Sequence, residues 1–391
     1  DAALAAQNTA ITNAGFADVD ALIAAYTALV TPVNEALTTA TNNLFGTASG
    51  DTFAGTFGTG ATMTAADTII DSTTTDADTL TLTGAAFANS ADTSIATITN
   101  IETINIVFDT LTNATIDAAG ISTSATINAS NVRSGSGAAL TVTNVTDGST
   151  LNISNFNTVT NATADAGGDM TLNANAATGS VRGTVSTDGV LTVNAAAATG
   201  TVRGDSATGD VTINGAAATV LTANSTSGDI TVTGAANANV DAVSTAAGNI
   251  TVTTALADDV VATTTGAGTV TATGEGDTAM TVTARTSTVT LSANDTVNNA
   301  TVTATGTGAG VESDTLNVTS GDDFTIANQA ADVVETVNVT GTAAIDATIT
   351  TSTATTYTGD SNVTFVGDHA MFHQAVVSGG ALLEINAMDS A

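Results

Sequence analysis

Acidic side chains are the residues of this chain whose type and spacing could do chemistry, and the chemistry they favour is cation binding. The sequence has 37 Asp and Glu residues, four Arg and no Lys, which gives a formal net charge of −33. Calcium takes about six to eight oxygen ligands from carboxylates, carbonyls and water. The metal-ligand candidates are Asp51 with Asp67, Asp71, Asp76 and Asp78; Asp258 and Asp259; Asp322, Asp323 and Asp332; Asp360 and Asp368; and the isolated Glu102 and Glu335.

A simpler role is open to each of these carboxylates. Asp residues in turns cap backbone N–H groups without any metal. Glu102 lies in "TNIETINIV" (99–107) and Glu335 in "ADVVETVNVT" (331–340), which are two versions of one phrase. A Glu at this place either marks the entry to a strand or ligates a metal, and both interpretations stay open.

The remaining reactive residues do not indicate a catalytic site. The chain has no Cys, and its two His residues, His369 and His373 in "HAMFH", lack the Glu of a zinc-binding H-E-x-x-H helix. Acid–base catalysis on a β scaffold needs clustered bases with cationic partners, and four Arg are few for that task. We therefore predict that the protein is not an enzyme.

The net charge excludes several partners. Nucleic acid requires a basic surface, and a bare anionic bilayer repels an acidic one. The longest apolar run, residues 21–30, is too short to span a bilayer. We expect no nucleic-acid partner and no transmembrane segment. Since so much like charge destabilises a compact chain, we expect bound Ca²⁺ or high salt to offset it.

Two of the four Arg residues lie at equivalent places in a repeated phrase. Arg182 in "GSVRG" and Arg203 in "GTVRG" are one repeat apart. Stacked repeats would place the two cations close together, which requires an acid between them. Asp188 and Asp205 are the candidates for a structural ion-pair ladder, with a contact between subunits as the alternative.

The elements that must position these residues begin with a helical segment. In residues 18–44, Leu22, Tyr26, Leu29, Val33 and Leu37 recur at helical spacing. Pro32 should kink the helix or divide it into a hairpin. The segment either packs on the rest of the chain as a cap or attaches to a preceding domain or a neighbouring subunit.

From residue 45 onward the chain consists of short segments with a β-strand pattern, which recur most regularly between 169 and 292. Phrases such as "LTVNA", "ITVTG" and "VTLSA" recur about every 20 residues, with a second β run between them. The Thr residues that mark the repeat are Thr171, Thr192, Thr212, Thr231, Thr251, Thr271 and Thr290. Alternation predicts that Ile230, Val232, Ile250 and Val252 face the core and that Thr231, Thr233, Thr251 and Thr253 face outward.

Two strands and two turns in each repeat predict an all-β fold, a parallel β-helix or β-solenoid with coils of about 20 residues. A row of β-sandwiches is the alternative, but it does not require so constant a period. We divide the chain into a helical N-terminal segment (1–44), an Asp/Thr-rich β domain (45–168), a regular solenoid (169–310) and a C-terminal β region (311–391), which ends in a contact surface or an export signal.

The order of motifs in the first part of the chain resembles a known family. "LFGTASGDTFAGT" (44–56), "DTIIDSTTTDADTLTLTG" (67–84) and "ITNIETINI" (98–106) follow a helical segment, as in the calcium-binding surface-layer (S-layer) and adhesin-like proteins of Gram-negative bacteria that type I secretion exports. The resemblance covers about residues 1–110. The tandem G-G-x-G-x-D repeat of repeats-in-toxin proteins is absent, and only "ASGDTF" (48–53) approximates it. Isolated calcium sites at turns are therefore expected, and not a regular ladder of ions.

The resemblance implies an extracellular structural protein that self-assembles into a calcium-stabilised surface layer, sheath or filament. Its partners would be further copies of itself, with a cell-surface polysaccharide as another candidate. The alternative is an adhesin or ice-binding solenoid that uses outward Thr-x-Thr rows, such as Thr231/Thr233 and Thr251/Thr253. Thr212/Asn214 and Thr290/Ser292 interrupt those rows in the sequence.

Overall fold

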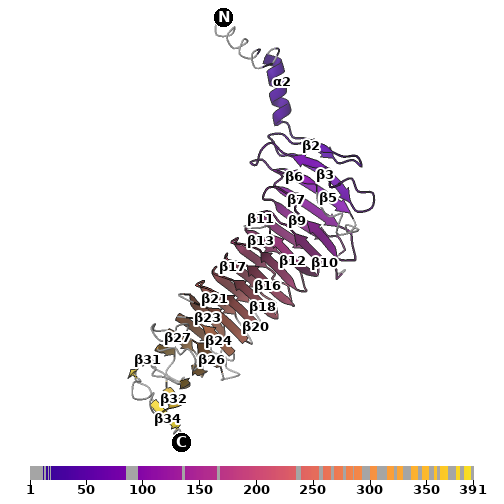
Figure 1. Cartoon of the computed structure of the whole chain (residues 1–391). Coiled ribbons are helices and arrows are strands. Elements are labelled where there is room, and N and C mark those ends of the chain that lie inside the picture. Colours follow the sequence, from indigo (N-terminus) through magenta and orange to yellow (C-terminus); the bar gives the residue numbers. More distant parts are fainter. Residues whose placement is uncertain are drawn as a thin grey trace, which may run out of the picture.

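The chain forms a β-solenoid, seen in a computed structural model as a long rod with α2 (Val19–Val30) projecting from its N-terminal end (Figure 1). The structure describes residues 12, 15, 17, 19–84, 96–133, 137–164, 168–234, 239–254, 259–265, 268–275, 279–284, 286–292, 300–305, 315–320, 324–328, 336–341, 346–351, 356–358, 362–368, 376–378 and 383–388. Every strand pairing in these residues is parallel, as the sequence predicted for a solenoid.

The largest sheet, sheet 1, has 17 strands in the described part of the chain, one from each coil. Its strands are β1 (Asn34–Ala36), β3 (Thr52–Phe57), β5 (Thr79–Gly84), β7 (Thr103–Phe108), β9 (Thr126–Asn131), β11 (Ser149–Ser154), β13 (Met170–Asn173), β15 (Leu191–Asn194), β17 (Val211–Gly215), β19 (Ile230–Gly234), β21 (Ile250–Thr254), β23 (Thr269–Glu275), β25 (Thr286–Ser292), β27 (Thr315–Ser320), β29 (Thr336–Gly341), β31 (Thr356–Thr358) and β33 (Val376–Ser378).

Two further sheets complete the coils. Sheet 3 has three short strands, β2 (Asn43–Phe45), β4 (Thr68–Ile70) and β6 (Thr97–Thr99). Sheet 2 has 14 described strands, β8 (Ala114–Asp117), β10 (Ala139–Thr143), β12 (Thr158–Ala164), β14 (Val181–Val185), β16 (Thr201–Ser206), β18 (Val220–Ser225), β20 (Asn239–Ser244), β22 (Asp259–Thr264), β24 (Ala279–Thr283), β26 (Ala300–Thr305), β28 (Phe324–Asn328), β30 (Asp346–Thr351), β32 (Asn362–Asp368) and β34 (Leu383–Met388).

Strand alternation places the core as the sequence predicted. Ile230, Val232, Ile250 and Val252 are buried, and the Thr residues between them are exposed. Because the coils bury mainly Val, Ile, Leu and Ala, the core is narrow along most of the rod. Aromatic side chains join it near the N-terminal end, where the ring of Phe108 lies edge-on to those of Phe57 and Phe156, with centroids 5.0 and 5.5 Å apart.

The predicted helical hairpin is wrong in its second half. The helix ends at Val30, and the chain continues as strand β1 beyond Pro32, which lacks the N–H that would extend the helix. Val33 packs against the core and Leu37 is buried in it. Their helical spacing to Leu29 was therefore a coincidence of the turn between helix and strand.

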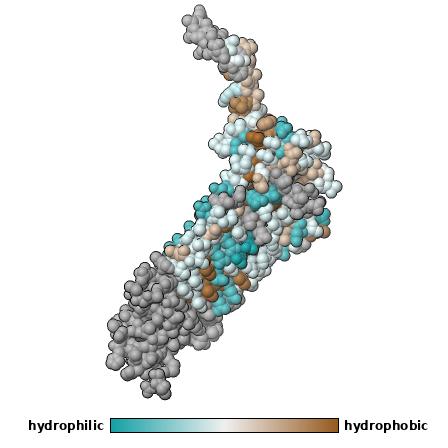
Figure 2. Space-filling view, in the orientation of Figure 1, coloured by the Kyte–Doolittle hydropathy of each residue, from teal (hydrophilic) through white to brown (hydrophobic). Residues whose placement is uncertain are grey.

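The apolar stripe of α2 does not pack on the rod. Ile23, Tyr26 and Leu29 are 55%, 64% and 54% exposed, and Phe45 on the neighbouring strand β2 is 64% exposed. Figure 2 shows brown and beige, the hydrophobic end of its colour scale, on the helix and on the first coils beside it. The packed cap predicted for this segment is therefore not formed by α2, whereas the residues after Pro32 do pack on the rod as strand β1 and Leu37.

The outward face of sheet 1 carries one Thr in register in every coil from β3 to β25. The register partners are Thr52, Thr79, Thr103, Thr126, Thr150, Thr171, Thr192, Thr212, Thr231, Thr251, Thr271 and Thr288. The sequence period predicted that Thr290 is the register partner of Thr271. Instead, Thr271 pairs with Thr288, and Thr290 pairs with Thr273. The turns before β25 are shorter than the average repeat assumes.

An Asn ladder runs beside the Thr column, two residues further along each strand. From Asn128 onward each Asn donates its side-chain Nδ2–H to the Oδ1 of the Asn in the preceding coil, at 2.7–2.8 Å. The ladder consists of Asn105, Asn128, Asn152, Asn173, Asn194 and Asn214. Beyond it the same column continues as Thr233, Thr253 and Thr273.

Candidate metal centre

Three acidic residues occupy one corner of successive coils, directly before strands β3, β5 and β7. Asp51, Asp78 and Glu102 precede Thr52, Thr79 and Thr103, which are register partners. Strand alternation points these three side chains toward the interior, so that Asp51 and Asp78 are fully buried and Glu102 is half-buried.

Each of these carboxylates accepts a backbone hydrogen bond from the coil before it. The N–H of Val33 donates to Asp51 Oδ1 at 2.6 Å, and the N–H of Asp51 donates to Asp78 Oδ1 at 2.6 Å. The N–H of Asp78 donates to Glu102 Oε2 at 2.9 Å. These bonds fix the carboxylates at the corner, and they leave the second oxygen of Asp78 for another partner.

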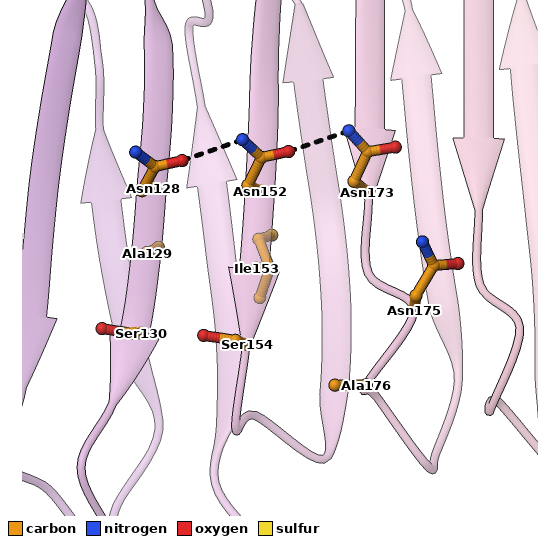
Figure 3. Close-up of a pocket in the computed structure, with 9 residues that line it drawn as sticks. All are labelled: Asn128, Ala129, Ser130, Asn152, Ile153, Ser154, Asn173, Asn175 and Ala176. Atoms are coloured by element: carbon orange, nitrogen blue, oxygen red, sulfur yellow. Dashed lines mark hydrogen bonds between the residues drawn. The ribbon is translucent and has the colours of Figure 1, made fainter.

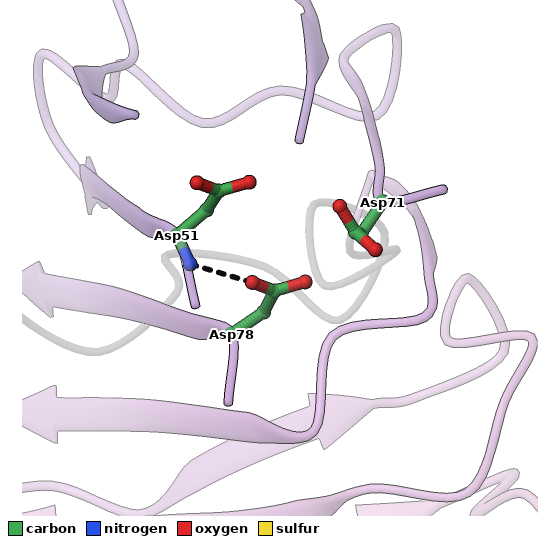
Figure 4. Close-up of side chains that lie close together, drawn as sticks. All are labelled: Asp51, Asp71 and Asp78. Atoms are coloured by element: carbon green, nitrogen blue, oxygen red, sulfur yellow. Dashed lines mark hydrogen bonds between the residues drawn. The ribbon is translucent and has the colours of Figure 1, made fainter. Parts of the chain in front are cut away.

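The loop between β4 and β5 adds two more acids to the corner. It brings Asp71 and Asp76 close to Asp78, so that ligand oxygens of Asp51, Asp71 and Asp78 all lie within 4.8 Å of one another, as do those of Asp76, Asp78 and Glu102. Figure 4 shows the carboxylates of Asp51, Asp71 and Asp78 lying around one small space. We call these five residues the acidic corner.

Three oxygen atoms of the acidic corner are buried without a hydrogen-bond partner. They are Asp71 Oδ1, Asp76 Oδ2 and Asp78 Oδ2. The other oxygens of Asp71 and Asp76 accept hydrogen bonds from the Thr73 N–H and hydroxyl, respectively. A buried anionic oxygen without a partner is strongly destabilising. The arrangement therefore has the chemistry of a site that needs a cation.

Gly46 provides the space beside these oxygens. A Cβ at this position would lie 2.2 Å from Asp71 Oδ1 and 2.7 Å from Asp51 Oδ2. Both distances are shorter than any allowed contact, so only glycine leaves the two carboxylates where they are.

The electrostatics of the corner also indicate a missing positive charge. Burial raises the pKa of Asp78 to about 7, and the neighbouring charges of Asp71, Asp76 and Glu102 add to this rise, against the hydrogen bond from the Asp51 N–H. Two unit charges about 4.8 Å apart repel by about 3 kcal/mol at an effective dielectric constant near 20. A divalent cation would remove this repulsion.

The donor set fits a hard cation. All the ligands are carboxylate oxygens, which suit Ca²⁺ and Mg²⁺ and not the softer metals that prefer His or Cys. With Ca–O bonds of about 2.4 Å, ligands on opposite sides of a calcium ion lie about 5 Å apart. The spacing within the corner is compatible with that geometry.

Asp67, which the sequence grouped with Asp71, Asp76 and Asp78, is not among the carboxylates that gather here. Asp67 Oδ1 accepts the Asn42 N–H at 2.7 Å, and Oδ2 accepts the Thr64 N–H at 2.6 Å. Burial raises its pKa, but these hydrogen bonds outweigh burial and bring the pKa below its ordinary value. Asp67 is a capping residue that joins two turns, which was the simpler of its two predicted roles.

The other predicted metal ligands are not brought together in the described residues. Asp259 is exposed at the start of β22, and Asp368 ends β32, where its side chain is not described. The remaining candidates lie outside the described residues; they are Asp258, Asp322, Asp323, Asp332, Glu335 and Asp360. The phrase that contains Glu335 leads into β29, a strand of sheet 1 like the β7 that follows Glu102.

The predicted Arg ladder is present on sheet 2, with Asp205 as its acid. Arg182 and Arg203 are register partners, and they contact Asp205 Oδ2 at 3.2 and 2.7 Å. Burial raises the pKa of Asp205, but the hydrogen bond from Arg203 and the charges of both Arg residues bring it below its ordinary value. Asp188, the other predicted partner, is exposed in the turn after β14.

Several residues that build these sites were not predicted. Thr47 donates its N–H to Asp51 Oδ2 and its hydroxyl to Asp51 Oδ1, the latter at 3.1 Å. The same loop satisfies the end of the helix, because the Ala48 N–H donates to Leu29 O at 2.8 Å. A sequence signal existed for one of the missed features, the Asn ladder, because Asn recurs at one phase of "TINI", "TLNI" and "TVNA".

No protein-family model matches the chain, and no curated protein or solved structure resembles it at a significant level. Among the described residues, no helix has the length and apolar character needed to cross a membrane.

Proposed function

We propose that the protein is an extracellular structural scaffold that self-assembles into a calcium-stabilised surface layer, sheath or filament, and that it has no enzymatic activity. The acidic corner carries this proposal. Its three unpartnered buried oxygens and its glycine-lined space make a site in which Ca²⁺ would stabilise the first coils of the rod. The other expected partner, a cell-surface polysaccharide, would anchor the assembly.

The acidic corner lies beside the end of helix α2, so that calcium bound there could influence contacts between chains. The loop that holds Asp51 also hydrogen-bonds the C-terminal end of α2, and α2 exposes the apolar side chains of Ile23, Tyr26 and Leu29. An exposed apolar helix face at the end of a rod is suited to a contact with another chain. Calcium in the corner would hold this face in a fixed orientation.

Electron microscopy with and without calcium tests the proposal. We expect ordered sheets or filaments in millimolar CaCl₂ that dissolve in excess chelator. Asp71→Asn, which removes one charge from the corner, should require at least tenfold more calcium for assembly, and Asp188→Asn, an exposed control, should assemble like the unmodified chain. Discrete monomers under every condition would contradict assembly, and unchanged assembly of Asp71→Asn would contradict the role of the corner.

One observation favours a second candidate, the adhesin or ice-binding solenoid. The outward Thr column is uninterrupted from Thr52 to Thr288, and the second column is also Thr at Thr233, Thr253, Thr273 and Thr290. Such a face presents hydroxyls at the spacing of the strands, about 4.8 Å. Thermal hysteresis of the freezing point would support ice binding, and Thr251→Lys should then abolish it.

A further inference from the structure

The outward face of sheet 1 contains a hollow where the sheet becomes narrower. Strands β9 and β11 have six residues each, whereas β13 and β15 have four. After Asn173 the chain turns inward at Ala174, which is fully buried, and returns to the surface at Asn175. The column of Ser130 and Ser154 therefore has no successor in the next coil, and the missing part of the sheet leaves an open space.

This hollow has a volume of about 330 Å³, and its wall combines amide and hydroxyl groups with a larger share of apolar surface. Figure 3 shows its polar side chains, which come from three successive coils of sheet 1 and the turn that follows: Asn128, Ser130, Asn152, Ser154, Asn173 and Asn175. The volume lies at the lower end of the range of about 300–1,000 Å³ for ligand pockets.

The wall retains hydrogen-bonding capacity toward the hollow. The Asn ladder uses one Nδ2–H and one lone pair of Oδ1 in Asn128 and in Asn152, and each amide has a second donor and a second lone pair. The hydroxyls of Ser130 and Ser154 have no partner among the described residues. Each position along the wall can thus donate and accept at once, which is the complement of a ligand hydroxyl.

The lining contains no charged or aromatic residue. In a chain with a net charge of −33 an anionic ligand would be repelled, and a cation would be drawn to the carboxylates outside the hollow. An apolar ligand would leave the amides and hydroxyls without partners. Ala129, Ile153 and Ala176 contribute to the apolar surface of the wall, which suits the C–H face of a sugar ring.

We propose that this hollow is a binding subsite for a neutral saccharide, with the sugar chain lying along the rod and crossing strands about 4.8 Å apart. The Asn amides and Ser hydroxyls would bind vicinal hydroxyls of the sugar. The proposal names a chemistry for the polysaccharide partner of the scaffold. It does not depend on the acidic corner, because the hollow lies on β9, β11 and the turn after β13 and the corner lies before β3, β5 and β7.

Saturation-transfer NMR and calorimetry with defined hexasaccharides test this subsite on the full chain in CaCl₂. The neutral probes are cellohexaose, laminarihexaose and mannohexaose, and an alginate hexamer is the anionic probe. We expect at least one neutral probe to bind. Ser154→Gln fills the hollow with a flexible polar side chain and should weaken binding at least tenfold, and Ser130→Gln on the neighbouring coil should do the same.

Ser186→Gln is the matched control, because Ser186 is exposed in the turn after β14, away from the hollow. It should bind like the unmodified chain, and circular dichroism should show the same melting temperature for all variants that are compared. The proposal is overturned if no neutral probe binds, if only alginate binds, or if Ser154→Gln and Ser130→Gln bind as tightly as the unmodified chain. Calcium-dependent assembly would be unaffected by each of these outcomes.

Discussion

The first coils of the rod and the regular coils further along use the same inward position for opposite chemistry. At the residue directly before the Thr column, β3, β5 and β7 are preceded by Asp51, Asp78 and Glu102. The coils from β13 to β23 have apolar residues there, namely Met170, Leu191, Val211, Ile230, Ile250 and Val270. The backbone is the same stacked parallel strand in both regions.

The comparison shows that stacking of coils does not depend on the chemistry of this column, provided that each side chain is satisfied. The apolar residues are stabilised by burial alone. The carboxylates need hydrogen bonds from the preceding coil and a counter-charge for the oxygens that remain. Between the two regions the column passes through Ala125 and Ser149, where the Ala125 N–H donates to the Ser149 hydroxyl at 3.1 Å. The hydroxyl repeats the acceptor role of the carboxylates without their charge.

A lone carboxylate placed in the regular region should cause the largest loss of stability. Ile230→Asp puts an acid into the same column without a glycine-lined space or neighbouring ligands. We expect a loss of about 4–5 kcal/mol in the free energy of unfolding, as for other uncompensated buried charges. Urea denaturation measures it, and Thr231→Asp, one residue along and facing outward, is the control and should change stability by less than about 1 kcal/mol. Equal losses in the two variants would contradict the inward assignment.

The pH dependence of the calcium-free protein should distinguish the acidic corner from the regular coils. Asp78 has a pKa of about 7 in the folded chain against an ordinary 3.8, so the folded state binds its proton more tightly. Its contribution to stability is fully present below about pH 4 and is lost as the pH rises through 7, by at most about 4 kcal/mol.

The difference between the unmodified chain and Asp78→Asn isolates this contribution from those of Asp67 and Asp205, which have lowered pKa values and act in the opposite direction. Urea denaturation between pH 4 and pH 8 measures it. In saturating calcium the decline should disappear, because the metal holds the carboxylate in its ionised form. A flat difference between pH 4 and pH 8 without calcium would show that Asp78 is not buried among charges.

Filling the space beside the carboxylates should abolish the calcium effect and leave the regular coils intact. Gly46→Ala places a methyl group against Asp71 and Asp51. A ligand at 100 times its dissociation constant stabilises a protein by about 3 kcal/mol, and we expect Gly46→Ala to lose that increment. The control is Gly60→Ala, since Gly60 has open space around it but a positive φ; it should lower basal stability slightly and keep the calcium increment. A full calcium response in Gly46→Ala would place the ion elsewhere.

The Asn ladder gives the smallest expected effect, and it tests the regular coils alone. Asn194→Ala removes the bonds to Asn173 and Asn214, both 2.7 Å long. Two half-buried hydrogen bonds contribute about 1–2 kcal/mol together. Thr192→Ala on the same strand is the control. Unfolding curves that are identical for the two variants would mean that the ladder follows the stacking and does not stabilise it.

The sequence predicted the solenoid and its inward residues because both follow from local alternation. It could not predict register, which depends on turn length; the pairing of Thr271 with Thr288 in place of Thr290 is an example. Nor could it predict where the helix ends, since Leu29, Val33 and Leu37 keep a helical spacing across Pro32.

The candidate site was predicted in part. The acids Asp71, Asp76 and Asp78 lie close in sequence, and Glu102 was recognised as an entry residue. Asp51 was grouped with them from the sequence, but only the stacking of coils shows that Glu102 reaches the same corner and that Asp67 does not. Gly46 could not be identified from sequence, because its role is a contact with residues from two other turns.

The one-way direction of the Asn ladder has an electrical consequence for the rod. Successive peptide groups of one strand point to opposite sides, so that the sheet backbone has only a small net dipole, but every amide of the ladder donates toward the N-terminal end. The aligned amides therefore add as peptide groups add in a helix, with the positive pole at Asn105. That pole lies on β7, the strand that begins directly after Glu102, so the rod has an internal polarity whose positive end lies in the same coils as the acidic corner.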